Sequence, residues 1–329
     1  MKTRNMLFAL LVTGLTIGFA SCGIKQQSAH PQEPEISIND SLQQIVAEAV
    51  TARLAINQAE WGCAVLIDKS GKVVAMFETD SIPHINEFIE VGTILTPFAV
   101  LAAASAGQVD STSKFAVTRS GYRIGEVTIH DSHPCDTTYC IREAIAISSN
   151  IAACQIVQKA FADSIELFNQ SMASMGIITK ATNQEELACC ALGVDCPASP
   201  MHLTWIYHYL AQGWFAKDWN VTKSGVIEGL HDCVWNNDLC TASVLKWMGD
   251  IVDYKAQSNK VAIIGKTGSL RLDESGRKHR KSFVGIFPEN DPQYTCLVMF
   301  NAPQNFPLYD AGMDCGSTVR IIAESILKQ

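Results

Sequence analysis

One motif carries residue types suited to acyl transfer: Gly-Lys-Thr-Gly-Ser at residues 265–269, directly after the apolar run Val261–Ile264. A strand that ends in this way can present the ammonium group of Lys266, the hydroxyl group of Thr267 and a backbone N–H to an acyl substrate. Gly268 has no Cβ and would let a substrate backbone come close. The alternative interpretation is an exposed edge strand whose lysine and threonine have no catalytic role.

A second motif, Ser-Ser-Asn at residues 148–150, opens the apolar stretch Ile151–Phe161, which is typical of a helix. Serine and asparagine are preferred at helix N-termini, where their side chains accept backbone hydrogen bonds, and that role alone could explain the motif. What favours a catalytic role is the order and interval of the two motifs, because Ser148 precedes Lys266 by 118 residues.

With this order and interval, the chain resembles the penicillin-binding proteins and serine β-lactamases, whose site combines Ser-x-x-Lys, Ser-x-Asn and Lys-Thr-Gly. The resemblance extends over nearly the whole domain, through Trp61–Asp68, Asp131–His133, Ile141–Ala144, Ala191–Gly193, Ser199–Pro200, Ser282–Gly285, Phe287–Pro288 and Asn301–Pro303. These segments favour the transpeptidase branch, since the Glu-x-x-x-Asn loop of β-lactamases is not found.

The resemblance implies roles for individual residues. Catalytic positions are Ser148, Asn150 and Lys266, and substrate contacts come from Thr267, Gly268 and Ser269. The implied ligand is a peptidoglycan stem peptide or a β-lactam, with a further protein of cell-wall synthesis as a possible partner and no cofactor.

The first family motif is altered. Residues 90–98 read Glu-Val-Gly-Thr-Ile-Leu-Thr-Pro-Phe, where the family has Glu-Pro-Gly-Ser-x-x-Lys-Pro-Phe. Thr93 therefore stands at the nucleophile, and Thr96 stands at the lysine that accepts its proton. A threonine hydroxyl is not a usable base near neutral pH, and general-base assistance is typically worth about 100- to 10,000-fold. The favoured hypothesis is a pseudoenzyme that binds its peptide or protein ligand without forming an acyl-enzyme.

Three other Ser-x-x-Lys matches do not replace the altered motif: Ser111–Lys114, Ser243–Lys246 and Ser325–Lys328. The first precedes an extended segment, so its two side chains need not share a helix face. The second comes after the Ser-Ser-Asn motif, and the third falls on the terminal helix.

Two alternatives remain open. Thr93 could attack with Lys266 as its base, with the backbone N–H groups of Thr93 and Ser269 as oxyanion hole, which would make an active D,D-transpeptidase or carboxypeptidase. A metal-binding or structural envelope protein could instead use the loop that holds His130, His133, Cys135 and Cys140, whose spacing zinc could accept.

The elements that must position these residues come from both ends of the chain. Apolar runs predict a hairpin from Cys63–Asp68 and Val73–Phe77, and later strands at Val261–Ile264, Ser282–Phe287 and Tyr294–Phe300. Helices are expected at Ser41–Leu54, Ile94–Ala106, Ile151–Phe161, Met201–Ala211, Ser243–Val252 and Val319–Leu327. This pattern, with the resemblance, predicts an α+β fold: a five-stranded antiparallel sheet flanked by helices, with a helical subdomain inserted between strands and the site between the two layers.

The N-terminus predicts export. Lys2 and Arg4, an apolar stretch and Ser21-Cys22 follow the order of a secretory signal at residues 1–21, and the cysteine resembles a lipidation site. Residues 22–38 are polar and would form a flexible tether, followed by the transpeptidase-like domain at residues 39–329. We therefore expect a lipoprotein of the bacterial cell envelope, held to a membrane through lipid on Cys22 and facing the periplasm.

Charge and cysteine content indicate which partners are unfavourable and which cysteines could pair. The chain has 25 basic and 33 acidic residues and a net charge of −8, which makes nucleic acid an unfavourable partner. Of the 12 cysteines, Cys135 with Cys140 and Cys233 with Cys240 are close enough in sequence to pair in an oxidising compartment. The thiols that lie inside apolar runs are expected to be packed in the core: Cys63, Cys154 and Cys296.

Overall fold

The computed structural model describes residues 34–110, 112–212, 256–304 and 311–328. The predicted signal segment, Cys22, the pair Cys233 and Cys240 and the helix Ser243–Val252 lie outside these ranges. Within the described ranges, none of the helices combines the length and apolar character that crossing a bilayer requires. The chain contacts the sheet before residue 39, because the Ser37 N–H donates to the Val73 carbonyl over 2.9 Å.

A five-stranded antiparallel sheet is built from both ends of the chain. Its order is β2-β1-β9-β8-β7, so the first hairpin and the last three strands meet where β1 pairs with β9. The strands are β1 (Trp61–Asp68), β2 (Val73–Glu78), β7 (Ile264–Arg271), β8 (His279–Phe287) and β9 (Tyr294–Asn301). The predicted sheet is confirmed.

One strand boundary differs from the prediction. The Lys-Thr-Gly motif does not follow a strand at Val261–Ile264 but lies inside β7, which begins at Ile264. The reason is pairing: β8 continues opposite the motif, with Ile264 opposite Ile286 and Arg271 opposite His279. Polar residues therefore hold ladder positions that an apolar pattern does not reveal.

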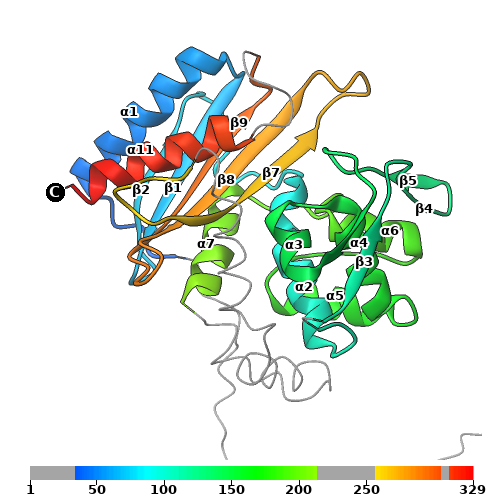
Figure 1. Cartoon of the computed structure of the whole chain (residues 1–329). Helices are drawn as coiled ribbons and strands as arrows, with labels where there is room; N and C mark the ends of the chain where they lie inside the picture. The colour runs from blue at the N-terminus through cyan, green and yellow to red at the C-terminus, as the bar shows by residue number, and fades with distance from the viewer. Residues whose placement is uncertain (1–33, 111, 213–255, 305–310, 329) are drawn as a thin grey trace, which may run out of the picture. The chain divides into compact units, whose positions relative to one another are not determined.

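Helices cover both faces of the sheet. Helices α1 (Asp40–Asn57) and α11 (Ser317–Ile326) pack side by side on one face, and α7 (Pro200–Ala211) lies against the other (Figure 1). Strand β1 is apolar on both sides, and alternate residues enter two separate cores: Val65 faces the α7 side, whereas Leu66 faces α1 and α11.

The inserted segment forms a mainly helical subdomain (Figure 1). It begins with the 3-10 turn η1 (Gly92–Leu95) and the helix α2 (Thr96–Ser105), every residue of which is buried. The predicted helix Ile94–Ala106 is thus divided, and Pro97 sits in the first turn of α2, where a missing N–H costs nothing. The remaining elements are α3 (Ile141–Ala146), α4 (Asn150–Phe161), α5 (Ile165–Ser174), α6 (Gln184–Ala191), and the small sheets β3–β6 (Lys114–Val117 with Thr137–Cys140) and β4–β5 (Tyr122–Ile124 with Val127–Ile129).

The thiols in apolar runs pack as predicted, since Cys63, Cys154 and Cys296 are buried. Cys135 and Cys140, which are close enough in sequence to pair, are free thiols in the structure. Cys135 contacts the Tyr139 hydroxyl over 3.2 Å, while Cys140 caps the N-terminus of α3. These local hydrogen bonds direct the two thiols to different partners.

A buried ion pair joins β8 to the C-terminal segment. The Lys281 ammonium lies 3.5 Å from the Asp314 carboxylate, and the two side chains are 1% and 0% exposed. Asn57 of α1 donates to the same carboxylate over 2.8 Å. Burial raises the pKa of Asp314, so the carboxylate needs its neighbours to stay ionised.

Removing the lysine should therefore destabilise the fold. We expect Lys281→Met to lower the free energy of unfolding by about 3 kcal/mol, because it leaves a buried carboxylate without its cation. Urea denaturation measures the change. The matched control is Lys278→Met, which breaks an exposed pair with Glu60 whose side chains are 52% and 45% exposed and should cost at most about 1 kcal/mol. Equal losses in the two variants would contradict a special role for the buried pair.

Candidate active site

The 3-10 turn that carries Thr93 lies directly against the motif strand β7. A Cβ at Gly268 would be 2.8 Å from the Ile94 Cβ, and one at Gly92 would be 2.7 Å from the Ser269 carbonyl oxygen. Gly92 also has a φ of +69°, a left-handed conformation that side chains disfavour. Both neighbours of Thr93 therefore pack on the strand, which places the threonine beside the Lys-Thr-Gly motif.

Lys266 joins this strand to the second motif. Its ammonium group donates to the Ser148 hydroxyl over 2.8 Å and to the Thr267 carbonyl over 2.6 Å. The side chain is 0% exposed. Burial without a carboxylate neighbour lowers the pKa of Lys266 to about 7. In a large fraction of the molecules, the Lys266 amine is therefore neutral near pH 7 and able to accept a proton.

The residues of the second motif have different roles: one caps a helix and another contacts Lys266. Ser149, not Ser148, caps α4 by accepting from the Ala152 N–H over 3.1 Å. Ser148 precedes the cap with a φ of +55°, an uncommon conformation for serine, and contacts Lys266. The Asn150 amide donates to the His130 carbonyl over 2.9 Å. The helix-cap interpretation therefore holds for Ser149, whereas Ser148 contacts Lys266 of the other motif.

Asp131 fixes this motif, a role that sequence reasoning did not assign. Its carboxylate accepts from the Ser149 hydroxyl over 2.8 Å and from the Ile151 N–H over 3.0 Å. An acidic residue at the N-terminus of α4 also complements the helix dipole. The spacing gave no signal, because 18 residues separate the aspartate from Ser149.

The two threonines of the altered motif have different surroundings. Thr96 is buried, and its hydroxyl donates to the Ala191 carbonyl over 3.2 Å. Thr93 is half-buried, and its hydroxyl has no hydrogen-bond partner among the residues that the structure describes. The Lys266 amine, which could serve as a base, donates its hydrogen bond to Ser148 and not to Thr93. The geometry therefore provides Thr93 with no base already in contact.

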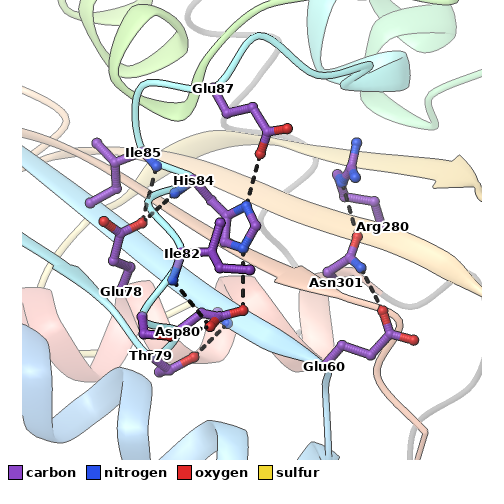
Figure 2. A network of polar contacts seen from close by, with 12 residues as sticks. Glu60, Glu78, Thr79, Asp80, Ile82, His84, Ile85, Glu87, Arg280 and Asn301 are labelled. Atoms are coloured by element: carbon purple, nitrogen blue, oxygen red, sulfur yellow. Dashed lines mark hydrogen bonds and ion pairs between the residues drawn. The ribbon is translucent and has the colours of Figure 1, made fainter.

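The segment that leads into the 3-10 turn, residues 79–91, is held by a polar network (Figure 2). We call it the strap. Arg280 of β8 donates to the strap carbonyl of Glu90 over 2.7 Å and to the Asn301 side chain over 3.1 Å. Asn301 in turn donates to Glu60 over 2.9 Å. The arginine therefore fixes the backbone three residues before Thr93.

His84 anchors the middle of the strap. Its ring stacks on Trp61, with centroids 4.1 Å apart. The two ring nitrogens face Glu87 at 2.9 Å and Asp80 at 3.4 Å (Figure 2). The backbone N–H of His84 donates to the Glu78 carboxylate. Sequence patterns do not reveal this network, because its members come from distant strands and the strap has no periodic pattern.

The alternative metal site lacks a ligand cluster. Across the part of the chain that the structure describes, no three His, Cys, Asp or Glu side chains gather closely enough to hold a metal ion. Within the loop around His130, Cys135 and Cys140 instead make the local contacts described above.

Comparison with known proteins decides the family. Residues 62–327 match the family model described as the penicillin binding protein transpeptidase domain. The chain belongs to the penicillin-binding protein transpeptidase family. The match runs from the second residue of β1 to just beyond the end of α11, and the resemblance seen in the sequence is confirmed.

Two curated members of the transpeptidase family are similar in sequence. The peptidoglycan D,D-transpeptidase FtsI of Escherichia coli K12 is 23% identical over 317 residues, covering 84% of this chain and 53% of FtsI. The probable peptidoglycan D,D-transpeptidase PenA of Neisseria flavescens is 23% identical over 141 residues, covering 38% of this chain and 34% of PenA. The chain spans about half the length of FtsI and a third of PenA.

Solved transpeptidase structures share the fold. The transpeptidase domain of penicillin-binding protein 3 from Burkholderia pseudomallei superposes with a TM-score of 0.73 at 18% identity, covering 88% of this chain and 95% of that domain. Penicillin-binding protein 3 of Mycobacterium tuberculosis, complexed with aztreonam, gives a TM-score of 0.70 at 16% identity, with 88% and 78% covered.

The buried amine makes the stability of this transpeptidase domain depend on pH. The pKa of Lys266 is about 7 when folded against 10.5 ordinarily, so between these values the unfolded chain holds a proton that the folded chain has lost. The free energy of unfolding contributed by Lys266 therefore rises with pH, by up to about 1.4 kcal/mol per unit.

We expect Lys266→Met to remove this rise, so that the stability difference between wild type and variant changes steadily from pH 7 to pH 10. Urea denaturation across this range measures it, with the exposed Lys69→Met as control. Parallel curves for wild type and Lys266→Met would show that the buried amine remains charged when folded.

Proposed function

We propose that this transpeptidase-family domain binds peptidoglycan stem peptides and has impaired acyl transfer. The observation that carries the proposal is the position of Thr96. The family lysine is replaced there by a hydroxyl that donates to the Ala191 carbonyl, so this position holds no proton acceptor for Thr93.

The binding half of the proposal is supported by the motif strand. Strand β7 is the last strand in the sheet order, and an edge strand can pair with an extended peptide. Thr267 is partly exposed on this strand, so its hydroxyl is available to a bound peptide.

The impaired half of the proposal rests on how the remaining amine is used. Lys266 contacts Ser148 and the Thr267 carbonyl, so it would have to turn from both to serve Thr93. The second candidate is an active D,D-transpeptidase or carboxypeptidase with Thr93 as nucleophile. It is favoured by the pKa of Lys266, which at about 7 leaves an amine able to accept a proton.

The proposed location is the bacterial cell envelope. Lipid on Cys22 would anchor the domain to a membrane, with the periplasm as its compartment and a tether that ends before Glu35, whose carbonyl accepts from the Val73 N–H. A domain that binds without reacting could recruit or regulate a second protein of cell-wall synthesis, which is the partner we propose.

Covalent labelling separates the two candidates. We expect intact-mass spectrometry to show no adduct after incubation of wild type with benzylpenicillin, because Thr93 lacks a base. The double variant Thr93→Ser/Thr96→Lys restores both reacting groups in an intact frame and should gain the mass of one penicillin. Labelling of wild type that Thr93→Ala abolishes would establish the second candidate instead.

Equilibrium binding tests the peptide site directly. We expect Thr267→Val to raise the Kd for a peptide ending in D-Ala-D-Ala by about tenfold or more, since it removes one hydrogen bond to a charged carboxylate. Isothermal titration calorimetry measures the affinity. Thr128→Val, at an exposed position of strand β5, is the matched control. A wild-type protein that does not bind this peptide better than its L-Ala-L-Ala counterpart would refute the proposed ligand.

A further inference from the structure

Ile94, the residue after Thr93, is held on one side by the motif strand. A Cβ added at Gly268 of β7 would lie 2.8 Å from the Ile94 Cβ and 3.2 Å from the Ile94 backbone nitrogen. The Ile94 side chain is 0% exposed. These contacts fix the side chain and the N–H end of Ile94, so the orientation of Thr93 depends next on how the carbonyl end of Ile94 is held.

The Ile94 carbonyl is held from a different element. The hydroxyl group of Tyr207, on helix α7, donates a hydrogen bond to this carbonyl. In a 3-10 turn, a carbonyl usually accepts from the N–H three residues later. The residue at that position is Pro97, which has no N–H. The tyrosine therefore supplies a donor that the backbone of the turn lacks at this position.

Burial and ring packing hold the Tyr207 hydroxyl in place. The Tyr207 side chain is 0% exposed, and its ring packs edge-to-face on Phe98 of α2, with ring centroids 4.9 Å apart. Burial raises the pKa of the Tyr207 phenol well above its ordinary value, so the hydroxyl remains a donor throughout the physiological pH range. The ring thus packs on the helix that follows the turn, while the hydroxyl contacts the turn itself.

Helix α7 is also tied to the chain that precedes Thr93. The Met201 N–H donates to the strap carbonyl of Ile85 over 3.0 Å. Just before the helix, Ala198 exchanges two backbone hydrogen bonds with Ile89 of the strap, over 3.0 Å and 3.2 Å. The helix and the residue that leads into it therefore hold the chain on both sides of Thr93.

We propose that Tyr207 is a positioning residue of the active site: its hydrogen bond to the Ile94 carbonyl fixes the turn that presents Thr93 to the ligand. Because the Tyr207 side chain is fully buried, it acts through the backbone of the turn and not by contact with the ligand. The inference rests on the proposed function in one respect, which is that Thr93 belongs to the ligand site, whether or not its hydroxyl reacts.

The same helix offers a matched control for a purely structural role. The Thr204 hydroxyl is also fully buried and donates to a carbonyl, that of Pro200, over 2.8 Å. Tyr207→Phe and Thr204→Val therefore each remove one buried hydroxyl from α7 and keep most of the side-chain volume. The first change removes a contact with the turn, whereas the second removes a contact within the helix.

Amide hydrogen exchange in the full chain tests the contact with the turn. The N–H groups of Gly92 and Thr96 are both hydrogen-bonded in the structure. We expect Tyr207→Phe to speed exchange at these two amides by about tenfold, because one hydrogen bond that holds the turn is lost. Thr204→Val should leave both rates unchanged, and the amides of β1 report global stability in each variant. Unchanged exchange in Tyr207→Phe, or equal acceleration in both variants, would overturn the proposal.

Acylation kinetics separate positioning from stability. The parent protein is the double variant Thr93→Ser/Thr96→Lys, treated with benzylpenicillin. Adding Tyr207→Phe should lower the acylation rate constant by about tenfold, because the nucleophile is no longer held in line, and should leave the non-covalent Kd unchanged. Adding Thr204→Val should change neither quantity. An unchanged rate constant with Tyr207→Phe, or the same loss with Thr204→Val, would also overturn the proposal.

The positioning role and the proposed function fail in different ways. A parent double variant that benzylpenicillin does not label would contradict the intact frame that the proposed function assumes. The exchange rates at Gly92 and Thr96 would still decide the role of Tyr207, because they are measured without a ligand.

Discussion

The close packing of β7 on the 3-10 turn is the constraint on which the rest of the site depends. Gly92 of the turn packs on β7, and Gly268 of β7 packs on the turn, at distances that leave no room for a Cβ on either glycine. Because a strand and a turn from distant parts of the chain meet here without side chains between them, the motif residues and Thr93 share one surface. Larger residues would separate the sheet from the helical subdomain and disperse the site.

Around this contact, the protein keeps the fold of its family and carries threonine at two positions of the first motif, Thr93 and Thr96. Lys266 remains fully buried next to Ser148, held by a hydroxyl and a carbonyl instead of a carboxylate. Its ammonium form is therefore costly, and the pKa falls. The position of the second family amine holds Thr96, whose hydroxyl contributes one more hydrogen bond to the helix packing.

Much of this arrangement could be predicted from the sequence. The apolar runs predicted β1, β2, β8 and β9 but placed β7 too early, and motif order indicated the family and the meeting of Ser148 with Lys266. The short elements α3, α5 and α6 and the small sheets were missed, because they carry few periodic residues and depend on packing against α2 and α4. The strap network and Asp131 were missed for a different reason: their hydrogen bonds join residues that are remote in sequence.

The pairing of β1 with β9 has a consequence for how the domain is made. The first hairpin leaves the ribosome more than two hundred residues before its neighbour in the sheet. Until the last strands emerge, the backbone groups along one edge of β1 have no native partner, and the apolar side chains of β1 have only part of their core. Folding of the sheet must therefore wait for nearly the whole chain to be synthesised. A molecular chaperone that shields this edge of β1 would have to stay bound throughout that time.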